Sequence, residues 1–261
     1  MDLNIAGQVV IVTGGSKGIG EGIARSVVRE GGIPVIAGRD QKTGENLVNE
    51  FQNNGKEAFF IKVLLSTPET CKMVVDKTLD KYGKINALVN NAGVNDGVGL
   101  ENGSPDLFKR SLLSNLGHYY YLAYYCLDAL KKTKGTIINI SSKTAITGQG
   151  NTSGYAASKG AQLALTREWS VELKKYGIRV NAIVPAEVMT PQYENWIKTF
   201  NEPEEKLKEI TNKIPLGKRM TTIEEIGDMA AFLISGKTAE TTGEFLFVDG
   251  GYVHLDRALL T

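Results

Sequence analysis

The chain has 261 residues, of which 42% are apolar and 23% charged, values typical of a globular protein with room for one large α/β domain. Thirty basic residues against 29 acidic ones leave a net charge of +1, which argues against nucleic acid or an anionic membrane as a partner. Two distant cysteines, a polar start and the lack of a bilayer-length apolar run predict a cytoplasmic protein without disulfides or a metal site.

A short β-branched run from Gln8 to Thr13 predicts a strand that is buried on both faces. It is followed by the glycine-rich loop 14–20 and by an apolar helical face that stops at Gly31, a residue type common at helix C-termini. This order of strand, loop and helix leaves backbone N–H groups and the positive helix end available to a phosphate. We therefore expect a phosphate-bearing ligand at this loop.

The second predicted strand, Ile33–Gly38, ends directly before Arg39. In NAD-binding folds an acidic residue at this strand end takes the ribose 2′-hydroxyl, whereas a basic residue accommodates a 2′-phosphate. Arg39, with Lys17 in the glycine loop as a second cation, therefore favours NADP(H), while NAD(H) stays possible. The alternative is that both side chains are solvated surface charges.

Further apolar runs predict strands at 58–65, 86–89, 136–141, 178–184 and 245–248. Helical patterns separate them, such as the one that begins at Thr67 and stops at Gly83. Strands that alternate with helices predict an α/β fold, a doubly wound parallel sheet of about seven strands with helices on both faces. We find no repeat or linker, so residues 1–261 should form a single domain.

Asparagine occurs at two positions that need a reason. The run Asn90–Gly93 follows a strand, and amide side chains at the carboxyl end of a parallel sheet can hydrogen-bond a ligand. Asn115 lies within a long predicted helix, 106–132, where asparagine is a poor choice. It indicates either a kink or a bond across the site. The tyrosines of 119–125 are more typical of packing at a helix interface than of a ring-stacking platform.

The stretch from Ser142 to Lys159 carries the groups best suited to proton transfer. Ser142 ends a strand, and Tyr155 and Lys159 are four residues apart on the next helix, so they share one face. A phenol has a pKa near ~10, and a fixed cation beside it favours the phenolate. The serine hydroxyl could hold a substrate oxygen next to that phenol.

Residues 191–221 differ in character from the rest of the chain. They are polar and charged, and Pro203 and Pro215 interrupt them. They could be an inert surface insertion. Because they follow a loop at the carboxyl end of a predicted strand, we interpret them as a substrate lid.

Together and in order, these motifs resemble the short-chain dehydrogenase/reductase family, from Gln8 to Gly251. The matching residues are Thr13, Gly14, Gly18, Ile19, Gly20, Asn90–Gly93, Asn115, Ser142, Tyr155, Lys159, Asn181, Pro185 and Thr190. The resemblance implies a Rossmann fold and hydride transfer between a substrate CH–OH and a nicotinamide. Two departures are Leu64, where many members carry an acid that touches the adenine, and Ala186, where glycine is usual.

The resemblance also implies residue roles. Tyr155 would be the general acid and base, Lys159 would lower its pKa and hold the nicotinamide ribose, and Ser142 would polarise the reacting oxygen. Asn115 would help keep a water that relays protons from Lys159. The cofactor would be bound by Gly14, Ser16, Lys17, Gly18, Ile19, Gly20, Arg39, Asn91, Ala92, Gly93, Tyr155, Lys159, Pro185, Val188 and Thr190. Among these, Asn91 would lie on the adenosine side, and Val188 and Thr190 would meet the carboxamide.

Three local strings, at 142–145 with 148–151, at 185–191 and at 248–256, are similar to those of bacterial L-fucose dehydrogenases, which oxidise the anomeric carbon of a free sugar to its lactone. A small-molecule polyol needs amide and carboxylate partners, and loops beside the site and Ser142 offer Asn95, Gln149, Asn151 and Glu187. Tyr193 or Trp196 could cover an apolar sugar face. Alternatively, Glu187 faces solvent and Gln149 only caps a turn.

Two rival functions remain. Reduction of a 3-oxoacyl or hydroxysteroid-like ketone would require an apolar tunnel, whereas these loops are polar. A non-catalytic nucleotide sensor would tend to lose Tyr155 or Lys159, and both are present. The family resemblance further implies a homotetramer.

Overall fold

The computed structural model describes residues 1–255. Its seven strands form one sheet in the order β3-β2-β1-β4-β5-β6-β7, and every neighbouring pair is parallel. The strands are β1 (Val9–Thr13), β2 (Ile33–Gly38), β3 (Phe59–Lys62), β4 (Ala87–Asn90), β5 (Thr136–Ile140), β6 (Arg179–Pro185) and β7 (Phe245–Val248). The predicted single-domain, doubly wound fold is confirmed.

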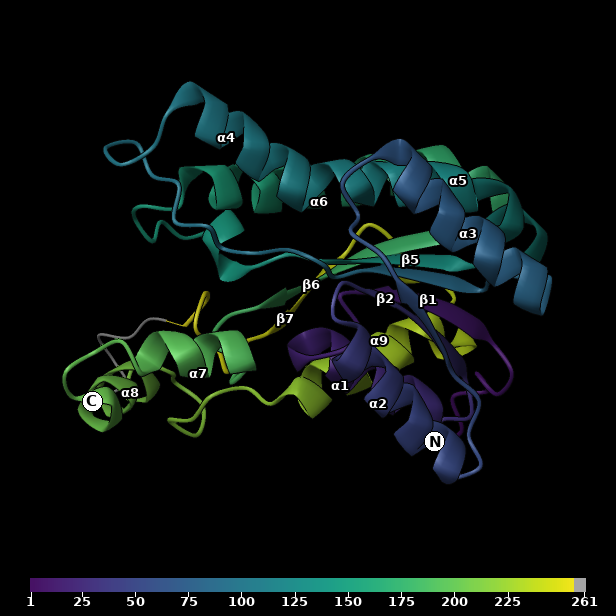
Figure 1. Ribbon diagram of the computed structural model, residues 1–261, viewed down its shortest axis with the longest axis horizontal. Helices are drawn as coiled ribbons and strands as arrows, with labels where there is room; N and C mark the ends of the chain where they lie inside the picture. Colours follow the sequence, from purple (N-terminus) through teal and green to yellow (C-terminus); the bar gives the residue numbers. More distant parts are fainter. Residues whose placement is uncertain (256–261) are drawn as a thin grey trace.

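Helices cover both faces of the sheet (Figure 1). One layer contains α1 (Gly18–Arg29), α2 (Gln41–Asn53) and α9 (Ile223–Ile234). The opposite layer contains α3 (Pro68–Tyr82), α4 (Pro105–Leu112), α5 (His118–Thr133) and α6 (Ser153–Leu173). Two short helices, α7 (Pro191–Ile197) and α8 (Pro203–Thr211), lie to one side of the sheet, at the end opposite the N-terminus.

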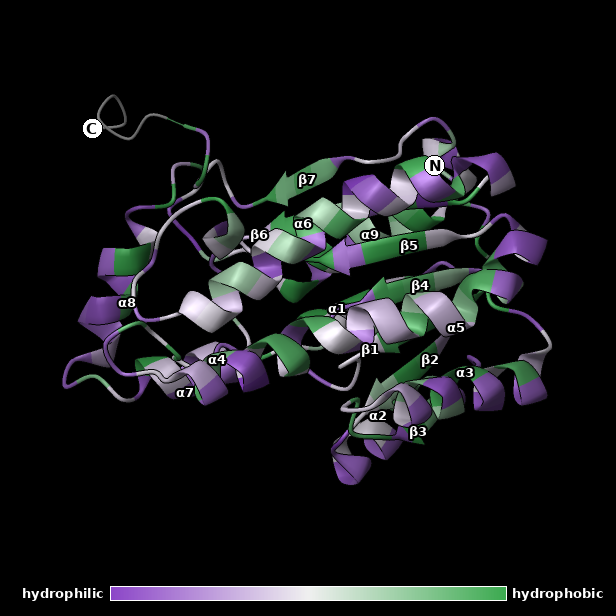
Figure 2. Cartoon of the chain, turned by 90° about the horizontal axis from the view of Figure 1, so that it is seen from above, coloured by the Kyte–Doolittle hydropathy of each residue, from purple (hydrophilic) through white to green (hydrophobic). Residues whose placement is uncertain are grey.

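Alternation along the central strands divides the core in two. Val9 and Ile11 pack with residues of α3, α5 and α6, whereas Val10 and Val12 pack with residues of α1 and α9. Successive side chains of a strand point to opposite faces, so a strand covered on both sides must be apolar at every position. Figure 2 shows this pattern, with hydrophobic strands and hydrophilic residues on the outer helices α3 and α8.

The long helix predicted for 106–132 consists of three pieces. A π-helical segment, Leu113–Gly117, separates α4 from α5, and Asn115 lies in its middle. Single π turns within helices are frequent at functional sites. The extra residue in the turn accounts for an asparagine where a regular helix disfavours one.

Two other boundaries differ from the sequence-based expectation. Strand β3 covers only Phe59–Lys62 of the predicted 58–65. Helix α2, which the apolar pattern left unassigned, begins after Asp40, whose carboxylate accepts a hydrogen bond from the Thr43 N–H at 3.1 Å. None of the helices in residues 1–255 is long and apolar enough to cross a bilayer.

Candidate active site

The glycine loop has the geometry of a phosphate site. Gly14 and Gly18 adopt φ values of +62° and +58°, which residues with side chains rarely adopt. A Cβ on Gly20 would lie 2.3 Å from the Gly14 carbonyl oxygen, so only glycine allows α1 to pack this closely on the loop. The residue before α1, Lys17, makes no side-chain cap, so the first N–H groups of the helix are available to an anion. These features fit the pyrophosphate of a dinucleotide.

Asn91 holds this loop in place. Its Nδ2 donates to the Thr13 carbonyl at 2.8 Å and to the Gly14 carbonyl at 3.4 Å. In return, the Thr13 hydroxyl accepts hydrogen bonds from the Asn91 and Ala92 N–H groups at 2.8 and 2.9 Å. The side chain predicted to lie against the adenosine is therefore committed to joining the ends of β1 and β4.

Two cations lie near the end of β2. Arg39 and Lys17 are both exposed. The adjacent carboxylate of Asp40 caps α2 through its Oδ1. Within residues 1–255, no carboxylate forms an ion pair with Arg39.

Ser142, just after β5, and Tyr155, in α6, are brought together. Their side chains form a hydrogen bond, although 13 positions separate them in the sequence. Burial raises the pKa of Tyr155 to about 12, and the hydrogen bond with Ser142 opposes this rise only in part. At neutral pH the phenol is therefore protonated, and it needs a nearby positive charge to act as a base.

Lys159 lies beside the Tyr155 ring, with 5.4 Å between its Nζ and the ring centre. Its Nζ donates to the Ile140 carbonyl at 2.7 Å and lies 3.5 Å from the hydroxyl oxygen of Tyr119. Because the side chain is deeply buried, desolvation lowers the pKa of Lys159 to about 7. The net effect of the surroundings on Tyr155 is thus a raised pKa, not the lowering that the resemblance assigns to Lys159.

Asn115 connects the π-helical segment to the loop after β4. Its Oδ1 accepts a hydrogen bond from the Val94 N–H at 2.7 Å, and its Nδ2 donates to the Ser111 carbonyl at 3.1 Å. A Cβ placed on Gly93 would lie 3.1 Å from this Oδ1 and 3.7 Å from the Lys159 Nζ. Asn115, Gly93 and Lys159 therefore meet at one point, as the resemblance requires, while the water relay stays a prediction.

The loop after β6 runs back over the glycine loop. A Cβ on Gly18 would lie 3.3 Å from the Thr190 Cγ2, so these segments are in contact. Thr190 caps α7 by accepting a hydrogen bond from the Tyr193 N–H at 3.2 Å. Val188 is buried and forms a β-bridge with Thr221, at the end of the predicted lid. Both ends of segment 191–221 are thereby fixed to the site.

The predicted substrate residues differ in their surroundings. Glu187 forms an ion pair with Lys143, and both side chains are 11% exposed. Tyr193 hydrogen-bonds Glu187, and its ring meets the Trp196 ring edge-on at 5.1 Å. Glu187 is therefore largely buried and has two side-chain partners, which excludes the alternative that it only faces solvent.

Gln149 and Asn95 are placed less decisively. Gln149 is exposed in the loop that leads to α6. The side-chain Oδ1 of Asn95 accepts a hydrogen bond from the Gly97 N–H at 3.3 Å, which shapes its own loop. Trp196 is 45% exposed and also contacts the Phe200 ring at 5.0 Å. Their predicted contacts with a substrate stay predictions.

Sequence reasoning gave no role to Lys143 or Tyr119. Lys143 directly follows Ser142, but its partner is 44 positions away, and a charge pair of this kind leaves no local pattern. Tyr119 is fully buried and its hydroxyl donates to the Ile140 carbonyl at 3.0 Å, beside the Lys159 Nζ. Its place in a run of tyrosines gave the only signal. Within that run Tyr119 is buried against β5 and α6, whereas Tyr120 and Tyr124 are more than half exposed.

The whole chain is similar to proteins of one enzyme family. The family model described as enoyl-(acyl carrier protein) reductase matches residues 14–253. The chain belongs to the short-chain dehydrogenase/reductase family. An L-fucose dehydrogenase from Oryctolagus cuniculus is 36% identical over 247 residues, which cover 94% of this chain and 85% of that protein. The 3-oxoacyl-(acyl-carrier-protein) reductase FabG of Chlamydia pneumoniae is 34% identical over 255 residues, 97% of this chain and 100% of that protein.

Solved structures of the family agree with the fold. The crystal structure of Cj0485 dehydrogenase matches with a TM-score of 0.95 and 49% identity, covering 100% of both chains. The L-sorbose reductase from Gluconobacter frateurii, complexed with NADPH and L-sorbose, matches with a TM-score of 0.93 and 25% identity, covering 98% of this chain and 100% of that one. As a family member, the protein is an NAD(P)-dependent oxidoreductase that acts on a CH–OH group.

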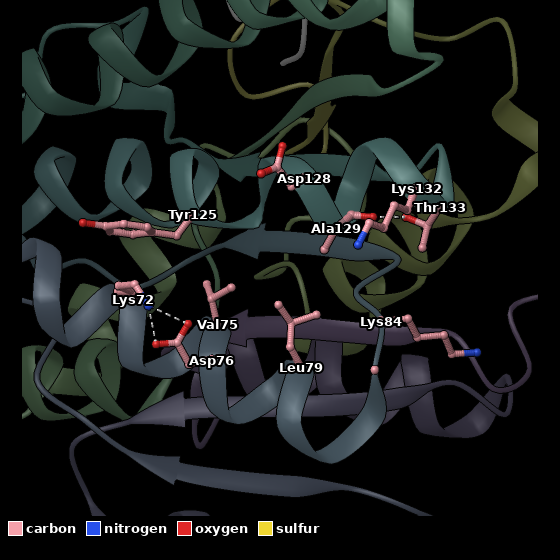
Figure 3. A pocket seen from close by; sticks show the side chains of 11 residues that line it. Lys72, Val75, Asp76, Leu79, Lys84, Tyr125, Asp128, Ala129, Lys132 and Thr133 are labelled. Atoms are coloured by element: carbon pink, nitrogen blue, oxygen red, sulfur yellow. Dashed lines mark hydrogen bonds and ion pairs between the residues drawn. The ribbon is translucent and has the colours of Figure 1, made fainter.

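A groove on the helical surface lies outside this short-chain dehydrogenase site. It runs between α3 and α5 and has a volume of about 230 Å³ (Figure 3). Its polar side chains, such as the ion pair of Lys72 and Asp76, lie on the surface, and none of the predicted site residues lines it. In the described part of the chain, no group of histidine, cysteine and acidic side chains is arranged to hold a metal ion.

Proposed function

We propose that the enzyme oxidises the anomeric CH–OH of a free aldose, L-fucose or a sugar of similar stereochemistry, to the lactone. The observation that carries this proposal is the polar surface beside the Ser142–Tyr155 pair. Glu187 and Lys143 lie on the loops after β6 and β5, and Tyr193 adds a hydroxyl bonded to Glu187. A polyol can add hydrogen bonds to these largely buried polar groups, whereas an apolar ketone would cover them without doing so, which costs binding energy. The similarity to L-fucose dehydrogenases supports the same choice.

Each group in the site has a defined task in this reaction. A nicotinamide held at the glycine loop and at Lys159 would supply the acceptor for the hydride that leaves the anomeric carbon. Ser142 holds the substrate oxygen, and Tyr155 takes its proton as the ring C–O–H becomes a lactone carbonyl. The positive charge of Lys159 favours the phenolate form of Tyr155, and Asn115 helps keep a water through which the proton reaches solvent. Preorganised positions of these side chains lower the barrier without further rearrangement.

We infer that NADP(H) is preferred over NAD(H). The exposed cations Arg39 and Lys17 flank the place where the adenosine ribose of a dinucleotide lies in this fold. Guanidinium pairs well with a phosphate dianion, and Asp40 is occupied as a helix cap. A solved relative bound to NADPH shows that the family accepts this cofactor.

Segment 191–221 serves as the substrate lid in this proposal. Its ends are anchored at Thr190 and Thr221, while Trp196 between them is 45% exposed. An indole ring on such a segment can cover the apolar face of a sugar, including a 6-methyl group.

We also expect a cytoplasmic homotetramer. The two cysteines are free and buried, which fits a reducing compartment.

A screen of free aldoses with NADP+ and NAD+, followed by absorbance of the reduced cofactor, tests the proposal. L-fucose, D-arabinose and L-galactose share the relevant ring stereochemistry and should be the best substrates. The resemblance to FabG names the competing function. Absence of aldose oxidation together with efficient reduction of 3-oxoacyl thioesters would contradict the sugar proposal and favour that competitor.

A further inference from the structure

The ion pair between Lys143 and Glu187 is unusual among those of the described residues because of its burial. Both side chains are 11% exposed, whereas both side chains in each of the other pairs are at least 25% exposed. Removing two charges from water is costly unless further hydrogen bonds complete their coordination. A pair of this kind therefore calls for an explanation beyond fold stability.

The pair lies at the reaction site. Lys143 directly follows Ser142, which bonds Tyr155, and Glu187 lies between Pro185, at the end of β6, and the buried Val188. Strands β5 and β6 are parallel neighbours in the sheet, so the loops that leave their carboxyl ends lie side by side and bring the two charges together. A substrate whose oxygen is held by Ser142 would have its adjoining atoms next to this pair.

Both charged groups retain unused hydrogen-bonding capacity. A carboxylate offers about four acceptor positions, of which Lys143 and Tyr193 use two at Glu187. An ammonium has three N–H groups, and that of Lys143 bonds Glu187 and lies 4.1 Å from the ring centre of Tyr252. The pair can thus accept one hydrogen bond and donate another to a ligand while it stays intact.

We propose that the Lys143–Glu187 pair recognises two neighbouring hydroxyl groups of the substrate, the carboxylate accepting from one and the ammonium donating to the other. This inference rests on the proposed sugar function and adds Lys143 as a residue that selects sugar substrates. Because the pair carries no net charge, it attracts a phosphate or carboxylate less than an unpaired lysine would. It selects neutral polyols, and it discriminates against analogues that lack the recognised hydroxyl.

The test is a cycle that pairs enzyme variants with deoxy sugars. Wild type, Lys143→Met and Glu187→Gln are assayed with L-fucose and with its 2-, 3- and 4-deoxy analogues. We expect wild type to prefer L-fucose over at least one analogue by about 100-fold in kcat/KM, since a site that hydrogen-bonds a hydroxyl rejects its absence strongly. Lys143→Met should reduce that preference at least tenfold, mainly through KM, while Lys143→Arg restores most of it. The control Lys72→Met, which removes an exposed lysine of another ion pair, should leave all ratios unchanged.

The possible failures are distinguishable. If both Lys143→Met and Glu187→Gln lower kcat/KM by one common factor for L-fucose and every analogue, the pair only supports the loops and the inference is wrong. If wild type oxidises no aldose at all, the proposed function fails and this inference fails with it. Affinity for NADP+, followed by fluorescence, should stay within about twofold of wild type in each variant and so reports intact folding.

Discussion

Burial of Lys159 makes the stability of the protein depend on pH in a predictable way. Its pKa falls from 10.5 in the unfolded chain to about 7 in the fold because the ammonium is desolvated. Since each pH unit corresponds to about 1.4 kcal/mol, a charged Lys159 destabilises the fold by about 4–5 kcal/mol below pH 7. Between pH 7 and 10.5 the unfolded chain binds the proton more strongly than the folded one, so stability rises with pH.

Lys159→Met removes this dependence. The variant also loses the hydrogen bond to the Ile140 carbonyl, at a cost of about 1 kcal/mol, because that oxygen keeps the bond from the Tyr119 hydroxyl at 3.0 Å. We therefore expect the variant to be more stable than wild type by about 3 kcal/mol at pH 6. The advantage should shrink by about 3 kcal/mol by pH 9.5, as wild-type Lys159 becomes neutral in the fold.

Urea unfolding without added cofactor measures this difference at several pH values, at one fixed protein concentration. Trp169, which is 6% exposed, supplies the fluorescence signal. Lys174→Met, at an exposed position just after α6, is the control, and its difference from wild type should not change with pH. A Lys159→Met difference that stays constant within about 1 kcal/mol from pH 6 to 9.5 would refute the reasoning.

Four further substitutions test individual groups. Tyr155→Phe should lower kcat by about 10²–10⁴ with cofactor affinity nearly unchanged, since only the proton transfer is lost, and substantial remaining turnover would contradict its role. Arg39→Asp should shift the ratio of kcat/KM values from NADP+ toward NAD+ by about 100-fold, whereas an unchanged ratio would make Arg39 a surface charge only. Asn115→Ala should reduce the free energy of unfolding by about 1–3 kcal/mol, because the Val94 N–H loses its acceptor, and an unaltered urea midpoint would argue against this. Trp196→Ala should raise KM for the aldose severalfold with little change in KM for the cofactor, and equal effects on both would argue against a lid that covers the sugar.

The fold could be predicted because its signals are local. Buried parallel strands leave continuous apolar runs, and the glycine loop between β1 and α1 marks the phosphate site by spacing alone. Ser142, Tyr155 and Lys159 were found in the same way, since the spacing of Tyr155 and Lys159 fixes their common helix face. The structure brings all three together as expected.

What could not be predicted depends on contacts between distant segments. The partner of Glu187 is Lys143, and nothing in either local sequence indicates their pairing across β5 and β6. Lys159 bonds the Ile140 carbonyl deep in the core, and this burial lowers its pKa. Only the packed structure defines that burial. Asn115 indicated an irregularity in the helix, but the sequence did not indicate that this irregularity is a π turn.

The central claim is that hydride leaves the anomeric carbon of a sugar. It is tested most directly by incubating the purified enzyme with L-fucose deuterated at that carbon and NADP+. We expect one deuterium in the reduced cofactor by mass spectrometry, L-fuconolactone or its hydrolysis product as the sugar product, and a slower rate than with unlabelled L-fucose. Reduced cofactor without deuterium, or a product oxidised at another carbon, would contradict the account.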